Sequence, residues 1–344
     1  MIYGANGYTG ELIARESKKL GLKPILAGRN RAKVEKLAGE LGFESRVFPI
    51  SDIKEVSDNI KDIFFVLHCA GPFIETSQVM AAACISSRVH YLDITGEIPV
   101  FQHLQGLDEK AKINDVMLLP GVGFDIVPTD CLAKKLKEAM PEGRTLRLGF
   151  FGLSDISRGT LKSMLKQIPN GSMIRRNGRL EIIPQLSVKK RVRIQGQEHS
   201  FFAIPWGDVF TAYYSTGIEN ISVFFSIPEA AANFISFFAP FTSLLKLEPV
   251  LQATGSIVDI MIEGPNKQKR EEGRSFIWGE IENSNGEVLM LQYETREGYR
   301  LTVDASLIII EEILNGKVRT GFCTPSMLLG SELLDRIPGT KIMI

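Results

Sequence analysis

A chain of 344 residues is longer than one ordinary hydrophobic core requires, so two domains are expected. Its 40 basic and 40 acidic residues cancel, which leaves no net charge to favour nucleic acid or a membrane surface. The four cysteines and four histidines have no metal-ligand spacing and no signal peptide is visible, so we expect no metal site and a cytoplasmic protein with reduced thiols.

The first 125 residues alternate short apolar runs with amphipathic helical stretches, which is typical of βαβ units. Strands are predicted at 2–3, 24–27, 44–49, 64–69, 90–93 and 116–119, and helices near 10–20, 31–41, 52–61, 75–86 and 100–113. Right-handed crossovers would bring the carboxyl ends of these strands to one edge, where open α/β sheets bind ligands. The pattern predicts an α/β fold with a Rossmann-type doubly wound parallel sheet.

A glycine-rich turn follows the first predicted strand and opens a helix. Its three glycines would allow a tight turn, a close approach of backbone to a pyrophosphate, and close packing of helix on strand. The expected cofactor contacts in this turn are Gly4, Asn6, Gly7, Tyr8, Thr9 and Gly10. Only residues 1–3 precede the turn, so the first strand is expected to be short or incomplete.

The turn after the second strand indicates which dinucleotide binds. NAD-binding units carry an acid there for the ribose 2′-hydroxyl, whereas Gly28-Arg29-Asn30-Arg31 contains none. Arg29, with Asn30 beside it, could hold a 2′-phosphate through its guanidinium fork. NADP is therefore favoured over NAD; the alternative is that Arg29 and Arg31 are solvated residues beginning the next helix.

Loops after the fourth, fifth and sixth strands should lie at the same edge. Ala70, Gly71 and Pro72 are small enough to let backbone lie against the ribose and phosphates, and Phe73 could form a wall of the nicotinamide site. Gly121, in the loop after the sixth strand, is a further expected cofactor contact.

Three residues near this edge are candidates for catalysis. Asp125 could relay a proton or anchor a substrate amine, or it could order the start of the next helix. Tyr91 and Asp93 could face the nicotinamide, or they could be buried residues at a strand end. Cys131 is expected to be a packed thiol.

From residue 144 onward the pattern becomes strand-like alternation with hairpin turns at 176–179 and 284–287. Strands are predicted at 145–153, 179–183, 189–194, 221–225, 274–282 and 288–294, followed by a helix at 299–314 and a loop at 321–326 that reaches the cleft. We expect a dinucleotide-binding domain at 1–130, an α+β mixed-sheet substrate and dimerisation domain at 131–298, and a return to the first domain at 299–344.

Two stretches of the second domain have unusual composition. Residues 221–247 are rich in phenylalanine but interrupted by Pro228 and Pro240, so they are too short to span a bilayer. A buried interface helix, an apolar substrate pocket, a dimer face and peripheral membrane contact all remain open for them. Residues 175–193 hold seven basic residues and one acid, which could solvate a sheet face or dock an anionic carrier.

Together these segments resemble the saccharopine dehydrogenase-like NAD(P)-dependent oxidoreductases, including the trans-acting enoyl reductase branch. The resemblance is carried by residues 3–10, 27–30, 70–73, 91–97 and 120–131, and more weakly by 157–160 and 321–325. It implies an NAD(P)-binding Rossmann domain, a mixed-sheet substrate domain and frequent dimers. The second domain is shorter and more apolar than in saccharopine-forming enzymes, which disfavours lysine metabolism.

The predicted function is an NADP(H)-dependent oxidoreductase that transfers hydride to or from an apolar or carrier-linked substrate, reducing C=C or C=N in an interdomain cleft. The Tyr-x-x-x-Lys dyad of short-chain dehydrogenases is absent, since Thr95 stands four residues after Tyr91. One alternative is a catalytically silent nucleotide-fold protein at lipid or membrane surfaces, and another is a saccharopine-type amino-acid dehydrogenase. The expected partners are a small-molecule or lipid-like substrate and a second copy of the chain, without nucleic acid.

Overall fold

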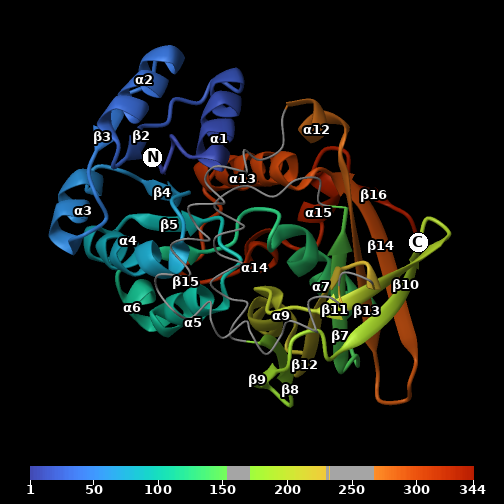
Figure 1. Cartoon of the computed structure of the whole chain (residues 1–344). Coiled ribbons are helices and arrows are strands. Elements are labelled where there is room, and N and C mark those ends of the chain that lie inside the picture. Colours follow the sequence, from blue (N-terminus) through green and yellow to red (C-terminus); the bar gives the residue numbers. More distant parts are fainter. Residues whose placement is uncertain (153–170, 230–231, 233–266) are drawn as a thin grey trace. The chain divides into compact units, whose positions relative to one another are not determined.

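Residues 1–152, 171–229, 232 and 267–344 are described in the computed structural model of the chain (Figure 1). The chain divides into two units, one comprising Met1–Val127 and Tyr299–Leu333, the other Pro128–Gly298 and Leu334–Ile344. Leu334–Ile344 thus group with the second unit, whereas the sequence placed all of 299–344 with the first.

The first unit is built on a seven-stranded parallel sheet in the order β15-β6-β5-β4-β1-β2-β3. Its strands are β1 (Ile2–Tyr3), β2 (Leu26–Gly28), β3 (Ser45–Val47), β4 (Phe65–His68), β5 (His90–Asp93), β6 (Met117–Leu119) and β15 (Gly321–Phe322). Because β1 pairs with both β2 and β4, the strand order reverses beside β1. The predicted Rossmann-type sheet is confirmed, and its ligand crevice is expected at the carboxyl ends of β1 and β4.

Six helices connect the first six strands. They are α1 (Tyr8–Lys19), α2 (Arg31–Leu41), α3 (Ile53–Ile60), α4 (Phe73–Ser87), α5 (Ile98–Gly106) and α6 (Asp108–Ile113). The single helix expected near 100–113 is divided at Leu107, whose backbone angles are not helical. Gly106 precedes that break, and glycine weakens a helix through its backbone entropy.

The tail at 321–326 is not the single loop that the sequence predicts. Gly321 and Phe322 form β15, which pairs in parallel with β6. The Phe322 N–H also donates to the Asp108 carboxylate at 2.7 Å. A strand of two residues carries no alternation, so only its tertiary contacts reveal it. Before it lies the long helix α13 (Gly298–Leu314), and after it the short helix α14 (Pro325–Leu329).

The second unit holds a mixed sheet with the order β10-β11-β12-β7-β13-β14-β16, to which the β8–β9 hairpin adds through β12. Its strands are β7 (Thr145–Phe151), β8 (Ser172–Arg176), β9 (Arg179–Ile183), β10 (Lys189–Ile194), β11 (Gln197–Ala203), β12 (Asn220–Ser226), β13 (Arg274–Glu282), β14 (Val288–Arg296) and β16 (Lys341–Ile342). β12 and β7 are parallel and the other pairs antiparallel. The predicted mixed sheet is confirmed, although the sequence missed β8, β11 and β16.

This second sheet is strongly curled, because side chains from strands far apart in its order meet. The Lys190 ammonium on β10 lies 2.8 Å from the Glu280 carboxylate on β13. The Gln292 amide on β14 donates to the backbone carbonyl of Arg193 on β10 at 2.9 Å. The curl encloses a core that includes Trp278, whose ring is fully buried. Aromatic residues Phe201 and Phe224 contact it.

Described helices of the second unit are α7 (Val127–Ala139), α9 (Asp208–Thr216), α12 (Lys267–Glu272) and α15 (Leu333–Arg336). A Cβ on Gly279 of β13 would lie 2.6 Å from Leu136 of α7, so the glycine allows close packing of helix on sheet. Cys131 is fully buried on α7.

The phenylalanine-rich stretch begins as a strand. Phe224 is buried in β12, and the Phe225 ring lies 5.3 Å from that of Phe150. Residues 233–266, with the remaining phenylalanines of the stretch, lie outside the described residues. Within the described part of the chain, no helix is both long and apolar enough to cross a bilayer.

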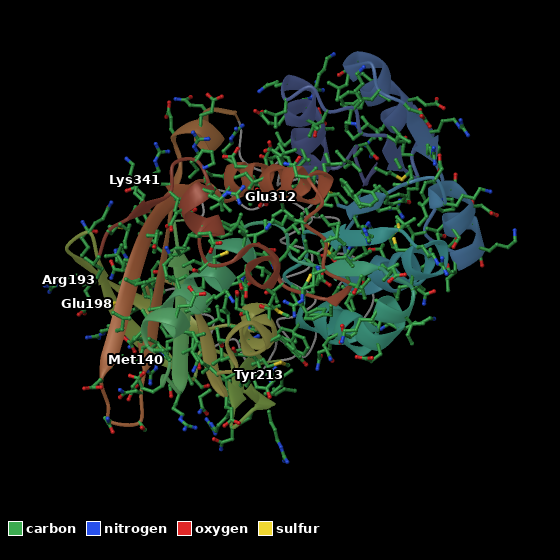
Figure 2. The ribbon with its side chains drawn as sticks, turned by 180° about the vertical axis from the view of Figure 1, so that it is seen from behind. Met140, Arg193, Glu198, Tyr213, Glu312 and Lys341 are labelled. Atoms are coloured by element: carbon green, nitrogen blue, oxygen red, sulfur yellow. The ribbon has the colours of Figure 1, made fainter. Side chains whose placement is uncertain are left out.

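The basic segment 175–193 forms ion pairs mostly with acids from other parts of the chain. Four of its cations form ion pairs: Arg176 with Glu181, Lys189 with Glu229, Lys190 with Glu280, and Arg191 with Glu198 and Glu229. Arg193 lies opposite Glu198 in the register of β10 and β11, at the edge of the molecule labelled in Figure 2. Most of the segment's charge is therefore balanced within the second unit.

Two glycine substitutions should change stability in opposite directions. A Cβ on Gly149 of β7 would lie 2.5 Å from the buried Trp278 ring, so Gly149→Ala should destabilise the protein by about 1–3 kcal/mol. Gly39, inside α2, has nothing within 4 Å of its Cβ position, so Gly39→Ala should stabilise by up to about 1 kcal/mol. Thermal unfolding measures both, and an unchanged transition for Gly149→Ala would contradict this packing.

Candidate functional site: the carboxyl edge of the parallel sheet

The glycine turn brings β1, α1 and the loop after β4 into close contact. Gly4 has a φ of +80°, and a Cβ there would lie 2.8 Å from the Ala70 backbone nitrogen. A Cβ on Gly10 would collide with the carbonyl oxygen of Gly4. Gly7 precedes α1 without capping it through a side chain. The first N–H groups of a helix have no partner within it, so this turn fits an anionic pyrophosphate.

The polar residues of the turn have different surroundings. Asn6 is half-buried, and its amide oxygen would lie 2.8 Å from a Cβ on Gly28, so its side chain reaches the end of β2. The Tyr8 ring meets that of Tyr299 edge to face at 4.9 Å. Thr9 is half-buried in the first turn of α1.

The two arginines of the turn after β2 differ in their contacts. Arg31 forms an ion pair with Glu35, one turn further along α2, at 2.7 Å. Asn30 caps α2, accepting a hydrogen bond from the Lys33 N–H at 3.1 Å. Arg29 is exposed and has neither an ion pair nor a side-chain hydrogen bond within the described ranges. Arg29 therefore stays the predicted ligand of a 2′-phosphate in this turn.

The loop after β4 is held by a threonine and a histidine. The Thr76 hydroxyl donates to the Ala70 carbonyl at 2.8 Å and lies 2.8 Å from His68 Nε2. Because the Thr76 hydroxyl proton is used in the bond to Ala70, the proton between Thr76 and His68 must come from His68 Nε2. Burial lowers the pKa of His68 to about 3, so the ring is neutral. Its Nδ1 has no partner among the described residues. Gly71 is exposed, and Pro72 and Phe73 are half-buried.

Tyr91 and Asp93 form a buried pair on β5. The Tyr91 hydroxyl donates to the Asp93 carboxylate at 2.7 Å, and the Thr95 and Gly121 N–H groups donate to the same carboxylate at 2.9 Å each. Burial raises the pKa of Asp93 to about 6 despite these bonds, and it raises the pKa of Tyr91 further above its usual value. Gly121, an expected cofactor contact, thus donates its own N–H to Asp93.

Glu97, which the sequence did not single out, holds the beginning of α4. Its two carboxylate oxygens accept the N–H groups of Phe73 and Ile74 at 3.2 and 2.9 Å. The residue before α4 is Pro72, whose side chain makes no capping bond. A negative charge at this position also complements the positive end of the helix dipole. In the sequence, the role of Glu97 is indicated only by a glutamate after Thr95 and Gly96, and that pattern does not indicate which residues it binds.

The loop that carries Asp125 is fastened to α13. The Thr302 hydroxyl accepts the Phe124 N–H at 3.0 Å, and the Ser306 hydroxyl donates to the Val122 carbonyl at 3.0 Å. Their spacing of four residues puts both hydroxyls on one face of the helix. Asp125 itself is half-buried, and a Cβ on Gly96 would lie 2.9 Å from its carboxylate. The structure therefore brings Asp125, Gly96 and Glu97 together, while Arg29 lies on the other half of the sheet.

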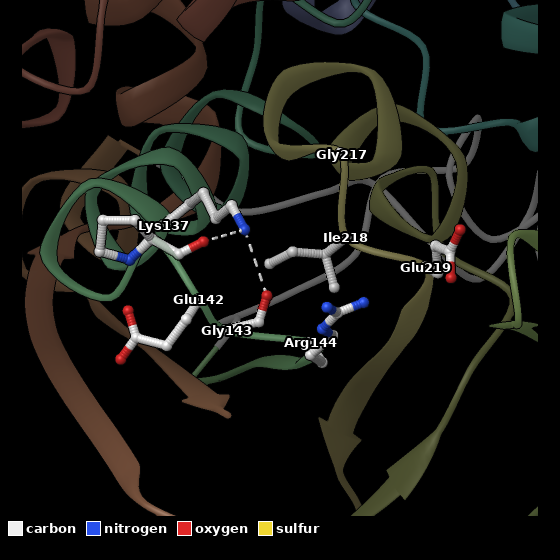
Figure 3. A pocket seen from close by; sticks show the side chains of 8 residues that line it. Lys137, Glu142, Gly143, Arg144, Gly217, Ile218 and Glu219 are labelled. Carbon is white, nitrogen blue, oxygen red and sulfur yellow. Dashed lines mark hydrogen bonds between the residues drawn. The ribbon is translucent and has the colours of Figure 1, made fainter. Parts of the chain in front are cut away.

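A cavity of about 230 Å³ in the second unit is lined by none of these residues. Figure 3 shows it between the end of α7 and the end of α9, with Lys137, Arg144 and Glu142 around it. The Lys137 ammonium donates to the carbonyls of Pro141 and Gly143 at 2.6 and 3.2 Å. Lys137 is thus occupied in closing the end of its own helix, and the cavity is not part of the predicted site.

The residues at the carboxyl edge fit a dinucleotide with a 2′-phosphate. The α1 terminus has no side-chain cap, the glycines carry no Cβ where the turn packs most closely, and Arg29 supplies an exposed guanidinium. By contrast, the α4 terminus already holds the Glu97 carboxylate, so it is not a second phosphate site. Among the residues that the structure describes, no cluster of three His, Cys, Asp or Glu side chains could hold a metal ion.

Residues 1–119 match the family described as the saccharopine dehydrogenase NADP binding domain. This match covers about a third of the chain, and over these residues the chain is similar to the saccharopine dehydrogenase-like oxidoreductases. The family's description names NADP, which confirms the predicted preference over NAD. The resemblance proposed from the sequence is thus confirmed.

Similar proteins include a human saccharopine dehydrogenase-like oxidoreductase, 29% identical over 204 residues that cover 51% of this chain and 47% of that protein. A trans-acting enoyl reductase of Mycobacterium leprae is 26% identical over 156 residues, covering 42% of this chain and 37% of that protein. The chain therefore matches about half or less of these relatives' length. Saccharopine dehydrogenase (L-Glu forming) from Saccharomyces cerevisiae shares the fold, with a TM-score of 0.65, 12% identity, and coverage of 100% and 99% of the two chains.

Reversing the charge of Arg29 should weaken NADPH binding and leave NADH binding nearly unchanged. A charge-assisted hydrogen bond is worth about 1.5–3 kcal/mol, so Arg29→Glu should raise the Kd for NADPH by roughly tenfold or more. Arg31→Glu makes the same charge change at a residue that already forms an ion pair with Glu35, and it serves as the control. Isothermal titration with NADPH and NADH measures both, and equal losses for the two variants would rule out Arg29 as the phosphate ligand.

Proposed function

We propose that the protein is an NADP(H)-dependent oxidoreductase that reduces a C=C or C=N bond of an apolar or carrier-linked substrate. The NADP-binding domain and the oxidoreductase relatives support the reaction class. One relative is named a trans-acting enoyl reductase, and that name supports a C=C bond as one of the two candidates. We favour an apolar substrate because the second domain is rich in phenylalanine.

The proposal depends most on the surroundings of Asp125. Reduction of a polarised double bond needs a hydride, which bound NADPH supplies, and a proton for the other atom of the bond. Asp125 follows β6, in the half of the sheet that holds the nicotinamide end of a dinucleotide. Burial, with a further contribution from the negative charge of Glu97, raises the pKa of Asp125 to about 7. A carboxyl group tuned to this range can donate a proton near neutral pH.

Tyr91 and Asp93 suit a different task. Tyr91 is fully buried and donates its hydroxyl proton to Asp93, whose carboxylate also accepts two backbone N–H groups. A pair already engaged with each other and with two loops is well placed to orient the site. We therefore assign the proton to Asp125 and the positioning of its loop to Asp93.

The reaction class can be tested with two probe substrates. We expect the protein to oxidise NADPH, followed by its near-ultraviolet absorbance, with a medium-chain enoyl-pantetheine thioester or with a cyclic imine. Asp125→Asn should lower kcat by about 10²–10⁴-fold, the usual contribution of a general acid, and change NADPH affinity little. Turnover that is the same in Asp125→Asn as in the wild type would remove Asp125 from the mechanism.

The raised pKa of Asp125 predicts a pH dependence with a definite sign. The general acid must carry its proton, so kcat/KM for reduction should be full at low pH and fall as pH rises through about 7. Carbon-13 NMR of aspartate carboxyl carbons can follow the same group without a substrate, with Asp125→Asn giving the assignment. A carboxyl titrating near its usual value of about 4 would contradict the prediction.

A further inference from the structure

Two of the helices that begin at the carboxyl edge of the parallel sheet, α1 and α4, differ in what binds their first backbone N–H groups. α1 follows Gly7 and has no side-chain cap, whereas α4 receives the Glu97 carboxylate on the N–H groups of Phe73 and Ile74. Glu97 comes from the loop after β5, and its side chain is 6% exposed. A buried carboxylate is costly unless it is hydrogen-bonded, so this contact holds the two loops together strongly.

The residues beside Glu97 make contacts in the other directions. The Thr95 N–H donates to Asp93, and the Thr95 hydroxyl accepts the Glu97 N–H at 3.0 Å. Gly96 lies directly against the Asp125 carboxylate, where a Cβ would come within 2.9 Å. Three consecutive residues thus contact the strand end, the loop after β6 and the loop after β4.

We propose that Glu97 is a second positioning residue of this site, beside Asp93, holding the Gly71–Phe73 loop against the nicotinamide end of the cofactor and keeping the adjoining Gly96 backbone against Asp125. This proposal rests on the proposed function for its catalytic consequence. It adds a residue that neither contacts the phosphates nor donates the proton, and that acts through the two loops it joins.

The charge of Glu97 gives this role a second effect. Glu97 raises the pKa of Asp125 and also that of Asp93 and Tyr91, so the acidic groups facing one another here disfavour ionisation of Asp125. Among described residues near the pair, His68 is neutral because burial lowers its pKa to about 3. Removing the Glu97 charge should therefore lower the pKa of Asp125.

Two substitutions distinguish the effect of the length of the Glu97 side chain from the effect of its charge. Glu97→Gln keeps the length of the side chain and one acceptor oxygen but removes the charge. Glu97→Asp keeps the charge but is one methylene too short to reach both N–H groups. Glu75→Gln makes the same charge change on an exposed residue in the first turn of α4, and is the matched control.

Hydrogen exchange of the protein without cofactor is the first measurement. The Phe73 and Ile74 amides should exchange about tenfold faster in Glu97→Asp, because the shorter side chain loses a charge-assisted hydrogen bond. They should also exchange faster in Glu97→Gln, because the acceptor that remains is uncharged. NADPH affinity, measured by titration, should fall about three- to tenfold in both. In Glu75→Gln, exchange of these two amides and NADPH affinity should remain as in the wild type.

The Asp125 titration is the second measurement. Its midpoint, seen by carbon-13 NMR, should move to lower pH in Glu97→Gln and stay near the wild-type value in Glu97→Asp and Glu75→Gln. Unchanged exchange at Phe73 and Ile74 in both Glu97 variants would overturn the proposal, as would an equal effect of Glu75→Gln. If exchange and affinity change as expected while Asp125→Asn retains full turnover, the positioning role stands and the assignment of Asp125 as the proton donor fails.

Discussion

The buried carboxylate of Asp93 is the interaction on which the carboxyl edge of the parallel sheet depends. It is wholly enclosed, and a charge in such a place is tolerated only with several hydrogen bonds. Tyr91 provides one from the same strand, Thr95 one from the following loop, and Gly121 one from the turn after β6. Loss of the carboxylate would therefore release two loops at once, including the one that leads to Asp125.

The parts of this edge that could be predicted from sequence are those determined by near neighbours along the chain. A strand, a glycine turn and a helix follow one another within ten residues, and the lack of an acid beside Arg29 is visible without any structure. Asn30, also expected at the cofactor, has a second task that the same local reasoning explains. Its side-chain oxygen accepts the Lys33 N–H of α2, as asparagine commonly does before a helix.

Residues whose roles depend on distant partners could not be predicted. Glu97 gives no local pattern that points to Phe73, 24 residues earlier, and Thr302 none that points to Phe124, 178 residues away. The partners of the basic segment in the second unit could not be predicted for the same reason. Its composition shows one acid, but Glu229 and Glu280 reach it from elsewhere in the chain. Arg175, nearly buried, instead lies over the Tyr213 ring at 4.3 Å.

The attachment of the Asp125 loop to α13 has a consequence for how the protein is made. The hydroxyls of Thr302 and Ser306 lie 178 and 184 residues after the backbone groups they bind. Contacts between residues so far apart in the sequence form late in folding, because the intervening chain must first be ordered or looped out. During synthesis the glycine turn emerges before the loop carrying Asp125, and that loop lacks its contacts with α13 until residues 128–298 have also been made. The glycine turn is thus built from near neighbours, whereas the support of the Asp125 loop is a late product of folding.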